Sequence, residues 1–363
     1  MRLTFLRNSL LCLLALAVSG TAGQRAVVAA ELFGLSPGSV ELQSAGPMAF
    51  GPSGVLFVGD PKAAKVYAIN TEDKKGNSSV GYAIDDLSSK AAAAFGGQVS
   101  VADLAVNPET GNAFLSVTAG DKAGLAKVTP DGKVTRLNLD KIGHAAVELP
   151  NPPEDKEIQT RRGPRNARVD SITDLAYTDG RVLVSGLSAS ESPSTVREFE
   201  FPFRESSAGM QVEIYHAAHG RSEDSSPIQT FIPFNVGGEP SVLAGFTCTP
   251  LVKIPIGNLK SNAKVTGTTV AELGNRNRPL DMIAYKQGGK DYLLLANSAR
   301  GVMKVSTDDL ASNEGLTEPV RGGGTAGQPY ETIESLQGVV QLDRLDDTHA
   351  LVIVQTDDGP MSL

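Results

Sequence analysis

Short hydrophobic runs separated by turn residues recur along the chain and predict a protein built from β-hairpins. The clearest pair is 171–177 and 181–186, two runs rich in β-branched and aromatic residues that flank Thr178-Asp179-Gly180. Similar pairs follow the same pattern at 47–50 with 55–59, 103–106 with 113–117, and 281–285 with 292–296. A hairpin that returns every few dozen residues predicts a radial or linear array of sheets.

The spacing of the strands predicts units of four. The first unit has strand candidates at 47–50, 55–59, 65–69 and 80–84, and four antiparallel strands are the content of one propeller blade. Units of about 55 residues give six blades in a single domain that spans 31–363. A seventh blade is the alternative, if the Pro-rich, charged insertion at 140–168 contains one.

The last unit predicts how the array closes. It has a hairpin at 339–342 and 350–354, and Pro360–Leu363 begins a third strand. We expect Val40-Glu41-Leu42 to supply the fourth strand, because such pairing leaves no exposed sheet edge. The prediction is therefore an all-β, six-bladed β-propeller closed by pairing of its N- and C-terminal strands.

The repeated unit resembles the NHL-repeat and SMP-30/gluconolactonase-like group of six-bladed β-propellers. The likeness lies in a small apolar inner strand, an Asp/Gly turn and a Val-Leu-Val strand, as in 174–186, and it covers nearly all of the chain after the N-terminal segment. It implies a central channel whose mouth holds any site. The metal ligands of the lactonase group do not carry over, because that group has an acidic residue at its first inner strand and this chain has Ala45-Gly46-Pro47.

The N-terminus predicts export. A basic start, an apolar run at 9–18 and a small-residue end form a signal peptide over 1–22, with cleavage after Ala22 or, alternatively, Ala30. The apolar run is too short to cross a bilayer, and no later segment is apolar enough. We therefore expect a secreted or periplasmic monomer with no membrane span.

Net charge and cysteine content limit the partners and the cross-links that this protein can have. The formal charge is −8, and the loss of Arg2 and Arg7 with the signal makes it −10, which disfavours nucleic acid as a partner. The basic segment 161–168 is an exception, and we expect a solvated loop there or an anion- or partner-docking loop. After loss of Cys12, Cys248 is the sole cysteine and cannot form an internal disulfide.

Three acidic residues are candidate metal ligands. Asp103, Asp174 and Asp281 each lie at or near the start of an expected inner strand, so they could converge on the channel. Carboxylates, with an amide such as Asn275 or Asn297, are suitable ligands for Ca²⁺ or another divalent cation. The alternative is that each aspartate caps its own blade by accepting backbone N–H groups.

A second set of residues is a candidate ligand site. Asn275, Arg276 and Arg278 precede an expected inner strand, and Asn297 and Arg300 could join them to hold a carboxylate or a sugar-like ligand. Ordinary loop polarity is the alternative. His216 and His219 have a spacing that binds metals on a helix, but they follow a strand, and we expect solvated loop histidines.

The sequence does not decide between binding and catalysis. It contains no phosphate loop and no haem-attachment site. The leading hypothesis is a propeller that binds a small molecule or a protein at its channel mouth without catalysis. The runner-up is a divalent-metal-dependent hydrolase or lyase of the lactonase-like kind, and a third hypothesis is a periplasmic accessory of a redox enzyme.

Overall fold

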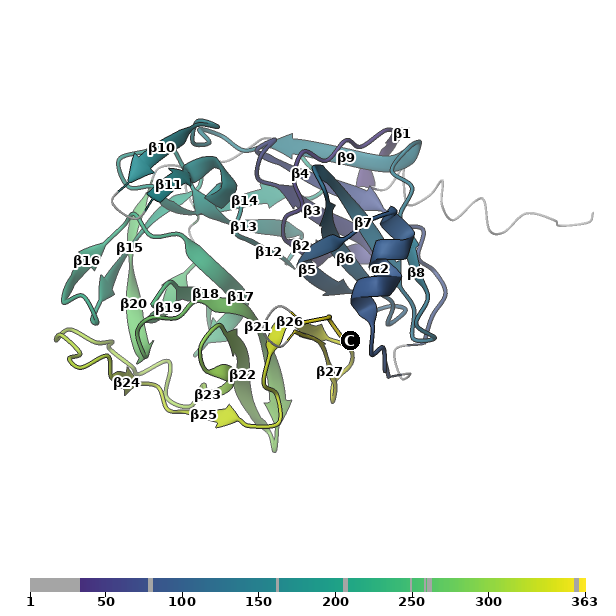
Figure 1. Cartoon of the computed structure of the whole chain (residues 1–363). Coiled ribbons are helices and arrows are strands. Elements are labelled where there is room, and N and C mark those ends of the chain that lie inside the picture. Colours follow the sequence, from purple (N-terminus) through teal and green to yellow (C-terminus); the bar gives the residue numbers. More distant parts are fainter. Residues whose placement is uncertain are drawn as a thin grey trace, which may run out of the picture.

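The computed structural model describes residues 33–77, 81–160, 163–204, 208–248, 250–257, 259, 263–355 and 359–363 (Figure 1). The predicted signal peptide and the pair Arg161-Arg162 lie outside these residues. The described chain is nearly all β, with one α-helix, α2 (Leu87–Phe95), and short 3₁₀ helices at Pro52–Gly54 and Ala167–Asp170. No helix in this part of the chain has the length and apolar character needed to cross a membrane. The all-β prediction is confirmed.

The strands form antiparallel sheets whose members are mostly consecutive along the chain. The first sheet has the order β2 (Met48–Phe50), β3 (Val55–Asp60), β4 (Lys65–Asn70), β9 (Ile142–Glu148) and β1 (Ser36–Gly38). The second consists of β5 (Val99–Val106), β6 (Ala113–Ala119), β7 (Lys122–Val128) and β8 (Val134–Arg136). The third consists of β12 (Asp174–Thr178), β13 (Arg181–Leu187), β14 (Ser194–Glu200) and β15 (Met210–His216), with β16 (Arg221–Glu223) beside β15.

The C-terminal half repeats this plan. The fourth sheet consists of β17 (Ile228–Val236), β18 (Glu239–Phe246), β19 (Pro250–Pro255) and β20 (Lys264–Leu273), with β24 (Thr325–Gly327) on β20. The fifth has β21 (Pro279–Gln287), β22 (Lys290–Asn297), β23 (Gly301–Ser306) and β25 (Tyr330–Ile333), and the sixth has β26 (Val339–Arg344) and β27 (Ala350–Val354). A separate hairpin, β10 (Glu157–Thr160) with β11 (Gly163–Asn166), lies in the predicted insertion.

One edge strand of each sheet lies on the inside of the molecule, and in the first sheet this strand is β2. The inner strands contact one another in the cyclic order β2, β5, β26, β21, β17, β12 and back to β2 (Figure 1). The second sheet therefore lies between the first and the sixth, and the third lies on the other side of the first. This order differs from the sequential order that the repeat predicts. A parallel pairing of β15 with β20 joins the third and fourth sheets.

The predicted pairing of the N- and C-terminal strands is not what the structure has. The N–H of Val40 donates to the carbonyl of Leu139 (3.0 Å), and β1 pairs with β9 in the first sheet. The C-terminal Leu363 instead exchanges two backbone hydrogen bonds with Ile84 (2.8 and 2.9 Å). Residues 81–84, expected in the first sheet, thus lie beside the sixth.

Hydrophobic packing explains this exchange of strands. Ile84 and Leu87 are buried in one cluster with Leu351, Ile353 and Met361, so the segment before α2 and the end of the chain share a core. β9, which lies in the predicted insertion, then takes the place beside β4, and β1 forms the outer edge of the sheet. Packing of long-range partners has decided which segment joins which sheet.

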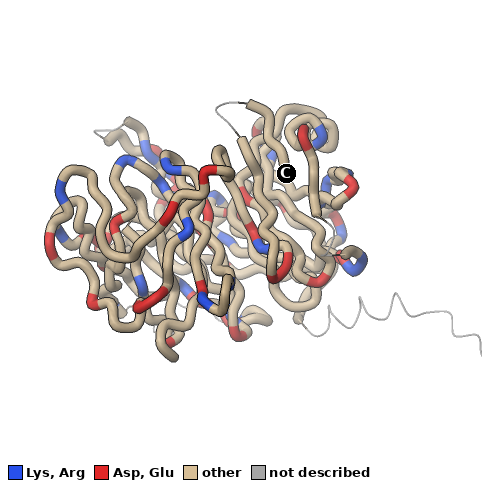
Figure 2. The backbone as a smooth tube through the Cα atoms, turned by 90° about the horizontal axis from the view of Figure 1, so that it is seen from below, with Lys and Arg blue, Asp and Glu red and all other residues tan. Residues whose placement is uncertain are grey.

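Local turn chemistry agrees with the sequence. Asp179 and Gly180 both have positive φ (49° and 74°), and Thr178 pairs with Arg181, so the β12–β13 hairpin closes through a two-residue turn. Acidic and basic residues are interspersed along the described chain (Figure 2). The inside of the molecule has a different charge balance, because its inner strands carry aspartates.

Candidate functional site in the central channel

Four inner strands each place an aspartate at the centre of the molecule. Asp103 on β5, Asp174 on β12 and Asp281 on β21 are the residues that the sequence predicts, and the structure adds Asp343 on β26. A break in strand register directly precedes Asp103 and Asp281 and aims these side chains. Asp343 was missed because the predicted strand ended at Leu342, although an acid follows an inner apolar run there too.

Each carboxylate accepts a backbone N–H from the neighbouring inner strand. The donors to Asp103, Asp174, Asp281 and Asp343 are Met48 (2.5 Å), Phe231 (2.6 Å), Leu342 (2.9 Å) and Val106 (2.7 Å), respectively. Asp174, Asp281 and Asp343 also accept the N–H of the following residue at 2.7 Å. The aspartates therefore bond backbone, as the alternative interpretation expected, and they link adjacent sheets rather than capping only their own.

Two cavities lie on opposite sides of these carboxylates. The larger, about 650 Å³, is lined by residues that follow the aspartates along the inner strands, and the smaller, about 250 Å³, by residues that precede them. Asp103, Asp174 and Asp281 line both cavities, so they form the boundary between the two. Asp343, Asp346 and Asp347 add to the wall of the larger cavity, and Arg344 is the sole Lys or Arg in it.

Burial raises the pKa of the four inner-strand aspartates, whereas hydrogen bonds lower the pKa of Asp346 at the cavity wall. Burial raises the pKa of Asp174 to about 7 and that of Asp343 to about 6, although backbone N–H groups oppose the shift. Burial and then the charge of Asp174 raise the pKa of Asp103 well above its ordinary value. Burial and then the charge of Asp103 do the same for Asp281. Ionisation of these buried carboxyls is therefore unfavourable, and a bound cation would stabilise their ionised forms.

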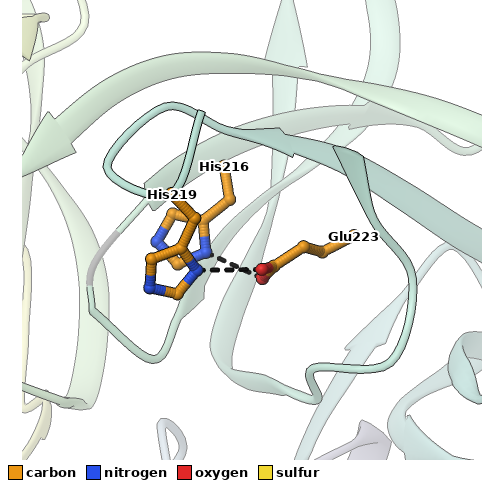
Figure 3. Close-up of side chains that lie close together, drawn as sticks. All are labelled: His216, His219 and Glu223. Carbon is orange, nitrogen blue, oxygen red and sulfur yellow. Dashed lines mark hydrogen bonds and ion pairs between the residues drawn. The ribbon is translucent and has the colours of Figure 1, made fainter. Parts of the chain in front are cut away.

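The aspartates are not gathered closely enough to form a compact metal-binding group as they lie. Of the described residues, a single group of three presents ligand atoms within 4.8 Å of one another, and it consists of His216, His219 and Glu223 (Figure 3). The expectation of solvated loop histidines is wrong for His216, which ends β15 and is 2% exposed. It holds for His219, whose side chain is 42% exposed.

The second predicted set is not brought together in one cavity. Arg278 lines the smaller cavity, and its backbone N–H donates to the Ser298 hydroxyl (2.8 Å). The Arg300 guanidinium donates to the carbonyl of Asn275 (3.3 Å), which holds the loop. Asn297 is buried and accepts the N–H of Ala299 (3.0 Å). Arg276 has a positive φ (60°) and lies outside the lining of both channel cavities.

Comparisons with known proteins find similarity to solved structures at low sequence identity. No family model matches the sequence, and the search of curated proteins yields no match. Among solved structures, the chain is similar to one in the mitotic checkpoint complex (8% identity, 90% of this chain and 89% of the other, TM-score 0.38). It is also similar to the PQQ-bound aldose sugar dehydrogenase of Streptomyces coelicolor (9% identity, 90% and 94%, TM-score 0.33). A putative gluconolactonase is similar at 11% identity, over 85% and 84%, with a TM-score of 0.25.

Proposed function

We propose that the protein binds a small cationic ligand in the larger cavity of its channel. The observation that carries the proposal is the lining of this cavity, which contains six aspartates and one arginine. The guanidinium of that arginine, Arg344, donates to the exposed Asp347 (3.0 Å). The raised pKa values of Asp174 and Asp343 support the proposal, because a cation favours their ionised forms.

The wall of the cavity favours an organic cation over a bare metal ion. Phe50, Tyr177 and Phe231 line it together with aliphatic side chains, and aromatic faces attract ammonium groups. Direct coordination of Ca²⁺ needs several oxygens at about 2.3–2.6 Å from one point. Among the described residues, no three of the inner-strand aspartates have ligand atoms within 4.8 Å of one another. Three of these carboxylates would therefore have to move to coordinate Ca²⁺ directly.

Titration calorimetry with putrescine, choline and CaCl₂ tests this proposal. We expect saturable binding of one equivalent of an amine, weakened at least tenfold in Asp174→Asn and in Asp343→Asn. The matched control is Asp308→Asn, whose half-exposed side chain pairs with Lys290 and lies outside the lining of both channel cavities. Binding of none of the three probes to the wild type would overturn the proposal, and circular dichroism would show that each variant is folded.

A metal-dependent hydrolase or lyase of the lactonase-like kind is the second candidate. It is favoured by the position of Asp103, Asp174 and Asp281, which line both channel cavities at their boundary. Asp103, Asp174 and Asp281 would then hold the metal, and a metal-bound water would act as nucleophile or base. Elemental analysis and a lactone screen with and without EDTA test it, and activity that EDTA leaves unchanged would exclude this candidate.

We further propose that the chain is an exported, monomeric six-bladed propeller. The closed ring of inner strands supports the blade number, and the sequence of residues 1–22 supports export. N-terminal sequencing of the extracellular or periplasmic protein tests export, and the expected mature chain starts at residue 23 or 31. A mature chain that retains Met1 would contradict it.

A further inference from the structure

A second cluster of ligating side chains lies at the end of the third sheet, apart from the channel. His216 ends β15, His219 lies in the following turn, and Glu223 ends β16 (Figure 3). His216 pairs with Arg221 and Ile214 pairs with Glu223, so His216 and Glu223 lie on the same face of the hairpin. The turn then folds back, with the N–H of His219 donating to the His216 carbonyl (3.0 Å). None of the three residues lines either channel cavity.

The donor atoms already have nearly the spacing of a metal site. Nδ1 of His216 lies 2.9 Å from one carboxylate oxygen of Glu223, and Nδ1 of His219 lies 2.9 Å from the other. The two rings are 3.8 Å apart between centroids, so both nitrogens face the carboxylate from one side (Figure 3). Ligand atoms around a tetrahedral Zn²⁺ are roughly 3.3 Å apart, since each bond is about 2.0–2.1 Å. One ligand atom from each of the three residues lies within 4.8 Å of the other two, so a modest rearrangement of the side chains would admit the ion.

Two buried polar atoms in or beside the cluster have no hydrogen-bond partner. Nε2 of the buried His216 has no hydrogen-bond partner, and neither does Oε2 of Glu272, whose residue is 0% exposed. The other oxygen of Glu272 accepts the N–H of Ala218, between the two histidines (3.0 Å). When a metal takes Nδ1, the proton of the ring moves to Nε2 and requires an acceptor. Metal-ligating histidines commonly donate that proton to a carboxylate.

We propose that His216, His219 and Glu223 form a zinc site that holds the β15–β16 hairpin closed. Two imidazole nitrogens and one carboxylate oxygen suit Zn²⁺ better than Ca²⁺ or Mg²⁺, which prefer oxygen ligands. The exposed side of His219 leaves the fourth position to water. His216 follows the residues of β15 that pair in parallel with β20, so the site lies next to the junction between the third and fourth sheets.

One neighbouring cation competes for the carboxylate. Nε of Arg221 donates to the same oxygen of Glu223 that His219 contacts (2.9 Å). The Arg221 side chain is 71% exposed, so it can leave the site without breaking a packed contact. Removal of this guanidinium is therefore expected to leave zinc affinity unchanged or to increase it.

Zinc titration of the EDTA-treated protein tests the site. We expect one equivalent to bind, with a rise in Tm of a few degrees at saturation. Glu223→Gln keeps one acceptor oxygen, and its amide NH2 can donate to the second histidine in its other tautomer, so the variant should fold. It should weaken zinc binding at least tenfold because the ligand charge is lost. His219→Asn removes an exposed ligand and should do the same. His349→Asn is the matched control, since His349 pairs with Asp346 on the surface.

The outcomes separate the site from incidental binding. Loss of zinc binding in Glu223→Gln and His219→Asn, with affinity retained in His349→Asn and Arg221→Ala, supports the proposal. Absence of zinc binding by the wild type, or equal affinity in all variants, overturns it. This result is independent of amine binding in the channel.

Discussion

Asp73 shows how single side chains far apart in sequence combine into one buried network. Its carboxylate accepts hydrogen bonds from Lys127, Thr110, Asn107 and Asn112, at 2.5 to 2.9 Å. Burial raises the pKa of Asp73, but these donors outweigh it, so the pKa lies below its ordinary value. These donors strongly stabilise the buried charge of Asp73. Loss of this charge would leave the four donor side chains without their charged acceptor.

We expect Asp73→Asn to reduce the free energy of unfolding by about 3–5 kcal/mol at pH 7, because the Lys127 ammonium loses its partner. Denaturant unfolding measures this value. Since the folded pKa of Asp73 is lowered, its contribution is present above the unfolded pKa of about 3.8 and is lost as pH falls through the folded pKa. A variant as stable as the wild type at pH 7 would contradict this description of the network.

The sequence predicts buried polar residues only where a local pattern of strand and turn residues marks their positions. Asp103, Asp174 and Asp281 were predictable because each follows the start of an inner strand. The partners of Asp73 come from separate hairpins and share no local signal. The His216 cluster was seen as a spacing, but its burial and its Glu223 partner depend on the pairing of β15 with β16.

Helix α2 was recognisable from its ends but was not predicted. Asp86 caps its N-terminus by accepting the N–H of Ser89 (2.9 Å), and Gly96 ends it with a positive φ (76°). Most hairpins were predicted, because β-branched runs and turn residues are local signals. Strands β1, β9 and β25 were not, since their places in the sheets are set by long-range packing.

Met361 tests the observed arrangement of the C-terminal segment. It is 5% exposed in the cluster with Leu87 and Ile353, and its carbonyl accepts the N–H of Leu87 (2.9 Å). We expect Met361→Ala to destabilise the protein by about 2–5 kcal/mol through the cavity it leaves. The exposed neighbour Pro360 supplies the control, Pro360→Ala, with an expected change within about 0.5 kcal/mol. Equal melting temperatures for the two variants would refute the placement of this segment.

The stability of the folded protein depends on the ionisation of the aspartates on the inner strands. Asp174 and Asp343 have pKa values of about 7 and about 6, above the ordinary 3.8, so the folded protein keeps protons that the unfolded chain releases. Their contribution is present below about pH 4 and is lost as pH rises towards about 7. The same carboxylates join adjacent sheets, and protonation leaves their acceptor oxygens in place.

We therefore expect the wild type to lose stability relative to Asp174→Asn as pH rises from 5 to 7.5. The reason is that the variant has no carboxyl to ionise at this position. Thermal melts of both proteins across this range measure the difference in Tm. A difference that stays constant with pH would show that Asp174 has an ordinary pKa.

The most direct test of the channel site is calorimetric titration of the tightest of the three probes at pH 5 and pH 8. Relative to pH 5, a cation that needs ionised Asp343 alone should bind roughly tenfold more tightly at pH 8, and one that needs ionised Asp174 alone roughly a hundredfold. A cation that needs both ionised should gain roughly a thousandfold. Binding near pH 6.5 should also release protons, which heats measured in buffers of different ionisation enthalpy reveal. Equal affinity at both pH values, with no proton release, would contradict a cation site at these carboxylates.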